Sequence, residues 1–123
     1  MDIFILENHE EIMALVEKHT CVQLVISGHN HTRRAVRENG VTYIGCPSIN
    51  SWPAMYSRFA MDRNGFNVTH MEIRDREKID ESRLALLGEE SPWMKSLGSS
   101  EAIEDYFTRG AISGRFQFQE NRC

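Results

Sequence analysis

The chain contains no long apolar segment and no dense group of basic residues. Its apolar runs fall far short of the roughly 20 residues that span a bilayer, and residues 1–6 lack the basic start and the length of a secretion signal. We therefore expect no membrane span and predict a cytoplasmic protein. The 14 Lys and Arg residues are outnumbered by 18 Asp and Glu residues, which gives a net charge of −4 and argues against nucleic-acid binding.

Cysteine is also scarce, with three residues in a chain of 123. Cys21, Cys46 and Cys123 are odd in number and widely spaced, so they form neither a disulfide framework nor a Cys-x-x-Cys metal pair. We expect all three to be reduced. The composition, 41% hydrophobic and 26% charged, is that of an ordinary globular domain with one modest hydrophobic core.

The first part of the chain predicts a helix, a strand and a hairpin. Residues 8–19 combine an apolar stripe with acidic residues in the first turn, which is typical of a surface helix with Asn8 as its N-cap. The short apolar run at residues 22–26 predicts a buried strand. Asn39-Gly40 is a type I′ turn signal, so we expect a hairpin that joins Arg34–Glu38 to Val41–Gly45.

A second hairpin and two helices follow. Asn64-Gly65 repeats the type I′ signal and predicts pairing of residues 56–62 with residues 66–73. Beyond it we expect helices at residues 80–87 and 101–109, separated by a stretch broken by Gly, Ser and Pro, and then a short tail. The order of all these elements predicts an α/β fold.

One segment carries a chemical signal, because the strand at residues 22–26 runs directly into Gly28-His29-Asn30-His31. Two imidazoles at positions i and i+2 of an extended loop project to the same side. Imidazole is the commonest metal-ligating side chain, so a metal site is one interpretation. A surface histidine pair without an ion is the other, because His-x-His also occurs by chance.

The residues around this loop extend the pattern. The strand and the Gly-His-Asn-His loop, the segment at residues 40–44, and Cys46-Pro47-Ser48 together resemble the C-terminal portion of the calcineurin-like metallophosphoesterases. Within that family they resemble the branch of cyclic-nucleotide and glycerophosphodiester phosphodiesterases. The resemblance covers residues 1–73 and implies part of a metallophosphoesterase sandwich. Residues 74–123 are then a helical C-terminal extension that packs on this part or on a partner subunit.

The resemblance implies a hydrolytic site with two divalent or trivalent metal ions, for which Fe, Mn and Zn are the candidates. Such ions activate a hydroxide that hydrolyses phosphodiesters or phosphomonoesters. By resemblance His29 ligates one ion and His31 the other, and Gly28 lets the backbone approach the metal centre. Asn30 either satisfies the loop backbone or contacts substrate, and Arg33 either binds a phosphate group or is a solvated residue at a strand end.

Most of the family's other ligands have no counterpart here, since no segment supplies its early Asp-x-His or Gly-Asp-x-x-Asp motifs. Asn8 and His9 imitate a third motif, but we interpret them as an N-cap and a first-turn residue. We therefore expect a segment of a larger enzyme that is inactive alone. Its uncovered strands predict a homo-oligomer. Two alternatives remain: a small protein that binds one ion through His29 and His31 of two copies, and a metal-free oligomerising module that retains the motif.

Several other side chains allow two interpretations. Trp52 and Tyr56 either pack against the sheet or face substrate, with packing the more frequent outcome for such residues. His70 shares a strand face with apolar residues, so we expect a histidine at the edge of the core. The aromatic residues of the C-terminal extension should pack it onto the sheet or a neighbouring subunit; they are Trp93, Tyr106, Phe107, Phe116 and Phe118.

Overall fold

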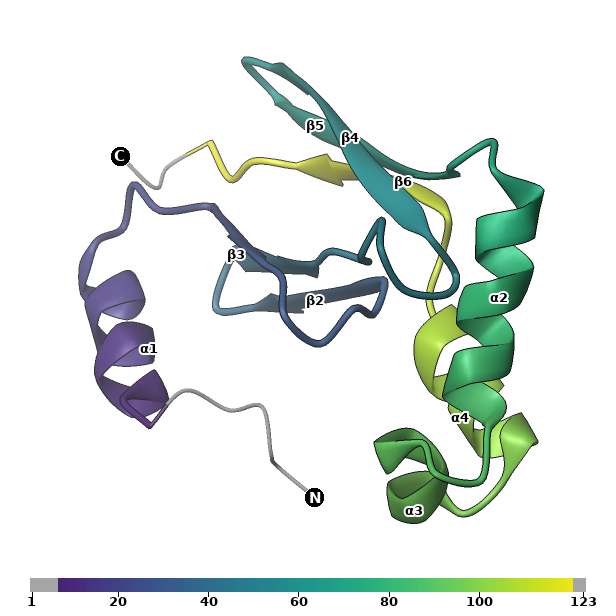
Figure 1. The fold of residues 1–123 in the computed structure, drawn as a ribbon. Helices are drawn as coiled ribbons and strands as arrows, with labels where there is room; N and C mark the ends of the chain where they lie inside the picture. The colour runs from purple at the N-terminus through teal and green to yellow at the C-terminus, as the bar shows by residue number, and fades with distance from the viewer. Residues whose placement is uncertain (1–6, 121–123) are drawn as a thin grey trace.

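The computed structural model describes residues 7–120, which form four helices and two three-stranded sheets (Figure 1). The predicted α/β class is therefore confirmed. In chain order the elements are α1 (His9–Lys18), β1 (Leu24–Ser27), β2 (Arg34–Glu38), β3 (Val41–Gly45), β4 (Met55–Asp62), β5 (Gly65–Glu72), α2 (Arg76–Leu87), α3 (Pro92–Leu97), α4 (Ser100–Thr108) and β6 (Ser113–Gln117).

The first sheet has the strand order β1-β3-β2. β1 runs parallel to β3, and β2 runs antiparallel to it. The hairpin of β2 and β3 has the predicted bounds, and its two turn residues, Asn39 and Gly40, have φ angles of 47° and 78°. Two successive positive φ angles are the requirement of a type I′ turn, so this prediction is confirmed.

The second sheet has the strand order β4-β5-β6 and is antiparallel throughout. The predicted hairpin of β4 and β5 is confirmed, but the prediction of a type I′ turn at Asn64-Gly65 is wrong. Gly65 is already paired with Asp62 in the ladder, so the two turn residues are Arg63 and Asn64, and neither has a positive φ. Instead, the Asp62 carboxylate accepts a hydrogen bond of 2.7 Å from the backbone N–H of Asn64.

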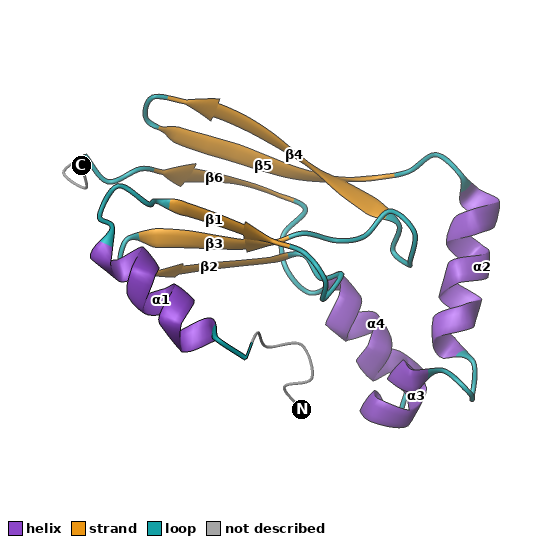
Figure 2. Ribbon diagram, turned by 60° about the vertical axis from the view of Figure 1, so that its left-hand side comes forward, coloured by secondary structure: helices purple, strands orange, loops and turns teal. Residues whose placement is uncertain are grey.

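The two sheets lie as layers, one above the other, and share one core (Figure 2). Ile44 of the first sheet packs with Phe66 and Val68 of the second, and these side chains are 1%, 0% and 4% exposed. The ring of Phe116 stacks on Phe66 with 5.2 Å between centroids. The extension beyond residue 73 thus contributes β6 and its aromatic side chains to the second sheet.

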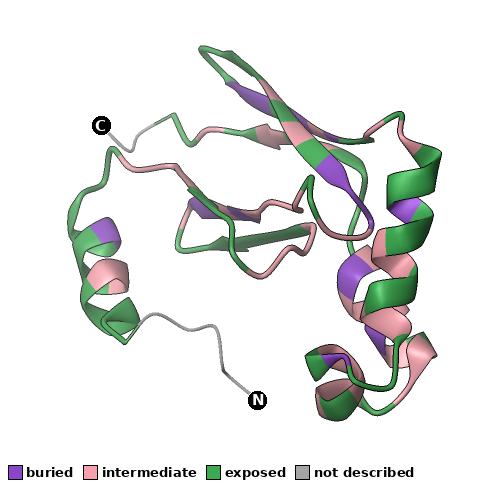
Figure 3. Ribbon diagram, viewed as in Figure 1, coloured by how far each residue is buried: buried purple, intermediate pink, exposed green. Residues whose placement is uncertain are grey.

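The helices sit at opposite ends of the sheets. α2, α3 and α4 gather at one end, where the rings of Trp93 and Phe107 meet edge to face at 4.8 Å and Ile103 is fully buried (Figure 1). α1 lies at the other end, and Val16 is its only buried residue (Figure 3). Leu15 is 57% exposed, so the predicted apolar stripe of α1 is only partly covered.

Two other expectations are wrong. β1 is not the buried strand we predicted, because it is an edge strand and Ile26 is 49% exposed. The cysteines are not all reduced: Cys21 is disulfide-bonded, whereas Cys46 is a free thiol and Cys123 lies outside the described residues.

Of the helices formed within residues 7–120, none has the length and apolar character needed to cross a bilayer.

Candidate functional site

The histidine loop leaves the first sheet at the C-terminal end of β1. Because β1 and β3 are parallel and Ser27 lies opposite Gly45, the segments that follow both strands start at the same edge of the sheet. The backbone N–H of Cys46 donates to the carbonyl oxygen of Ser27 at 2.8 Å. This pairing brings the histidines next to the segment of residues 46–57.

Both histidines have a left-handed backbone conformation, with φ angles of 72° at His29 and 56° at His31. Such angles are unfavourable for a residue with a Cβ and persist only where the surroundings hold them. The N–H of Asn30 donates back to the carbonyl oxygen of Gly28 at 2.9 Å, which tightens the loop. Gly28 itself has room for a side chain, since a Cβ there would meet no atom of the described residues within 4 Å.

The two histidine side chains line one open hollow of about 410 Å³, which we call the histidine hollow. Cys46, Ser48 and Tyr56 are among the other residues that line it. The hollow therefore combines two imidazoles with a thiol and hydroxyl groups at the edge of the sheet. Both histidines border this one hollow, but the loop is not extended as the sequence analysis assumed, since both residues have positive φ angles.

His31 is oriented by a neighbouring hydroxyl group. Its Nδ1 lies 2.8 Å from the Oγ of Ser51, and the residue is half-buried, whereas His29 is exposed. Burial first, and then the charge of His29, lowers the pKa of His31 below the ordinary value for histidine. The neutral imidazole is the form that binds a metal ion. Since Ser51 engages Nδ1, the nitrogen that remains for a ligand is Nε2.

The described residues do not complete a metal centre. Within residues 7–120, no group of three or more His, Cys, Asp and Glu side chains is arranged to hold a metal ion. Two imidazoles leave half of a tetrahedral coordination shell unfilled. The histidine pair therefore fits the role of partial ligands, with the other ligands supplied from elsewhere.

A second, smaller hollow of about 270 Å³ lies across the loop from the histidine hollow, and Gly28 borders both. Asn30 lines the smaller hollow and not the histidine hollow. Its Oδ1 is buried and has no hydrogen-bond partner among the described residues. The loop thus presents imidazoles to one hollow and an amide to the other.

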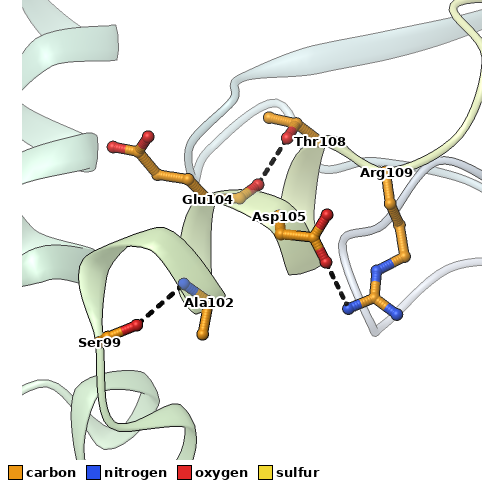
Figure 4. A network of polar contacts seen from close by, with 6 residues as sticks. All are labelled: Ser99, Ala102, Glu104, Asp105, Thr108 and Arg109. Atoms are coloured by element: carbon orange, nitrogen blue, oxygen red, sulfur yellow. Dashed lines mark hydrogen bonds and ion pairs between the residues drawn. The ribbon is translucent and has the colours of Figure 1, made fainter.

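Arg34, Tyr106 and Arg109 also line this second hollow. Arg109 follows α4 and donates to the carboxylate of Asp105 at 3.1 Å (Figure 4). Its guanidinium also lies over the ring of Tyr106. Figure 4 also shows how both ends of α4 are held, by the Ser99 hydroxyl at its start and by the Thr108 hydroxyl near its end.

Arg33 lines neither of these two hollows. Its guanidinium donates to the carbonyl oxygen of Thr108 and to the sulfur of Met55, 3.9 Å away, while its Nε is buried without a partner in the described residues. A Cβ on Gly110 would lie 2.1 Å from the carbonyl oxygen of Arg33. The structure therefore places Arg33 where it ties the loop to the end of α4.

Three further residues have the following surroundings. His70 is 7% exposed and its Nδ1 lies 2.9 Å from the Oγ of Ser57, so the expected histidine at the edge of the core is confirmed. Trp52 packs edge to face on Phe107 at 6.4 Å, which is packing against a helix and not against the sheet. Tyr56 is 43% exposed and lines the histidine hollow, so packing was the wrong expectation for it.

Asn8 and His9 lie apart from these features. Asn8 occupies the N-cap position of α1, and its carbonyl oxygen accepts from the N–H of Ile12 at 3.1 Å, but its side chain makes no capping hydrogen bond. His9 is an exposed first-turn residue, as expected.

Comparison with known proteins returned no match, whether with protein-family models, curated proteins or solved structures.

Proposed function

We propose that this chain carries two histidine ligands of a dinuclear metallophosphoesterase centre that hydrolyses phosphodiesters or phosphomonoesters. The observation that carries the proposal is the placement of His29 and His31 in one hollow at the end of β1, with His31 oriented by Ser51. His31 ligates through Nε2, and His29 binds the neighbouring ion. Residues 7–120 do not supply the remaining ligands, so our proposal includes that the chain is inactive alone.

The surroundings of the loop support this proposal. A metallophosphoesterase sandwich has two facing sheets with the Gly-His-x-His loop at a strand end, and this chain has two facing sheets with its loop directly after β1. The lowered pKa of His31 favours the neutral imidazole, which is the form that binds a metal ion. When bound, the ions supply the hydroxide and neutralise the charge that develops on the phosphoryl group.

Metal titration of the purified chain tests the ligand assignment. Addition of Mn²⁺ should broaden the ring signals of His29 and His31 in an NMR spectrum before those of His19 and His70. Removal of the Ser51 hydroxyl by Ser51→Ala should weaken the binding of Zn²⁺ about tenfold, because loss of a hydrogen-bond partner of a ligating histidine costs 10–100-fold in affinity. Isothermal titration calorimetry measures this difference.

Ser99→Ala is the control, since it removes a serine hydroxyl that accepts from the N–H of Ala102 at the start of α4 and does not line the histidine hollow. It should leave the affinity for Zn²⁺ unchanged. Equal effects of the two serine variants, or early broadening of His70, would contradict the assignment. Hydrolysis of an activated phosphodiester by the chain, abolished by His31→Ala, would overturn the claim that the chain is inactive alone. One ion bound per two chains would instead favour a metal site shared between two copies.

A further inference from the structure

The β2 strand is an open edge of the first sheet. It pairs with β3 on one side only, and all five of its residues are exposed (Figure 3). Both ribbon views show β2 as the outermost strand of its sheet (Figures 1 and 2). An unpaired strand of this length presents backbone N–H and C=O groups that can pair with another strand.

The hairpin decides which backbone groups point outward. In a hairpin with a two-residue turn, Glu38 and Val41 form the hydrogen-bonded pair next to the turn, and every second pair repeats this arrangement. Val36 and Arg34 are therefore also hydrogen-bonded to β3. The N–H and C=O groups of Ala35 and Arg37 face the open edge instead.

The side chains of β2 are placed so that two antiparallel copies of the strand would bring opposite charges face to face. If a second β2 pairs antiparallel with the first about an axis at Val36, Val36 lies opposite the partner's Val36, and Arg34 lies opposite the partner's Glu38. These are the pairs without backbone hydrogen bonds, in which side chains approach most closely. Within residues 7–120, neither Arg34 nor Glu38 has another ion pair to give up.

We propose that two copies of this chain associate through β2, forming one continuous six-stranded sheet. Ala35 and Arg37 make the backbone hydrogen bonds across the axis, and Arg34 and Glu38 form an ion pair on each side of it. Val36, which is 39% exposed in the single chain, becomes covered by the partner's Val36.

The other strand edges are less suited to this arrangement. A second β6 paired about the centre of Ser113–Gln117 would place Arg115 opposite the same arginine, and like charges directly opposite one another are destabilising. The four residues of β1 carry no charge, so two copies of β1 would form no ion pair. Two copies of β4 paired about the centre of Met55–Asp62 would place Arg58 opposite the partner's Phe59, which is also not an ion pair. Opposite charges across an antiparallel pair therefore select β2.

Charge exchange at β2 tests the proposal in sedimentation experiments on the full chain. We expect a dimer at tens of micromolar. Arg34→Glu and Glu38→Arg, made singly, should each weaken the dimer about tenfold, because two attractive cross-strand pairs become repulsive. The double variant, with the two charges exchanged, should restore the dimer. Arg58→Glu makes the same charge change on β4 and should leave association unaltered.

A cysteine at the axis tests the register. Under mild oxidation, Val36→Cys should give a reducible covalent dimer, because the two Cβ atoms of such a directly opposed pair are about 4.5–5.5 Å apart. Arg37→Cys should not. Circular dichroism checks that each variant keeps its fold. A wild-type monomer at 100 μM, a dimer indifferent to both single charge changes, or equal cross-linking at the two cysteine positions would overturn the proposal.

Discussion

At the scale of single residues, His70 is the buried group with the clearest consequence for stability. Burial first, and then the positive charge of Arg33, lowers its pKa in the folded chain. In the unfolded chain its imidazole titrates near pH 6.5. Below that pH the unfolded state therefore binds more protons than the folded state, and the stability due to neutral His70 is lost as the pH falls toward the folded pKa.

Replacement of His70 by glutamine tests this dependence. His70→Gln keeps a group that can bond to Ser57 and removes the titration, so the fall in melting temperature between pH 7 and pH 5 should become shallower. The pKa of His31 is also lowered in the folded chain, so part of the pH dependence of the melting temperature remains in this variant. Thermal denaturation over this pH range measures the effect. His19→Gln, at an exposed residue, is the control, and an equal change of slope in both variants would contradict the explanation.

The residues of the candidate site were predictable in part. The sequence indicated that His29 and His31 lie on one side, and both border one hollow, but the extended loop assumed in that prediction is replaced by two left-handed residues. Ser51 was not predicted, because it lies 20 residues from His31 in the chain and meets it only through folding. The parallel pairing of β1 with β3 could have indicated this, since it forces the segments after both strands to one edge of the sheet.

At the scale of elements, turn signals predicted both hairpins, although the turn type predicted at Asn64-Gly65 was wrong. Two other elements were missed for different reasons. The sequence around α3 does contain helix signals: Ser91 caps it, Pro92 begins it, and Gly98 ends it with a φ of 79°. We interpreted those residues as helix breakers. β6 has no comparable local signal, because its strand conformation depends on pairing with β5, more than 40 residues earlier in the chain.

The contact between β5 and β6 should depend on Gly65. A Cβ at this position would lie 2.1 Å from the carbonyl oxygen of Phe116 in β6. Gly65→Ala should therefore displace β6 and lower the free energy of unfolding by about 1–3 kcal/mol. Urea denaturation measures this loss. Gly88→Ala, where a Cβ would make only ordinary contacts beyond 3.5 Å, should stay within about 0.5 kcal/mol. Equal losses of stability in the two variants would show that the close approach of β6 to Gly65 does not limit the side chain at this position.

At the scale of the whole molecule, the core and the candidate site depend on the same layering. The inner faces of both sheets close on one cluster, while the histidine hollow lies at the edge where β1 and β3 end. Tyr56 and Ser57 reach that hollow from β4, so the second sheet forms part of its wall. Loss of either sheet would therefore open the site as well as the core.

This shared core predicts that the two sheets unfold together. Phe66 is fully buried between them and packs against Ile44 of the first sheet. Phe66→Ala should reduce the free energy of unfolding by about 3–5 kcal/mol, because the cavity is large and walled by both sheets. Met61→Ala, at a 59% exposed residue of β4, should change it by less than about 0.5 kcal/mol. Hydrogen exchange should show protection falling equally in β3 and β5 of the Phe66→Ala variant; a loss confined to β5 would mean that the sheets are separate folding units.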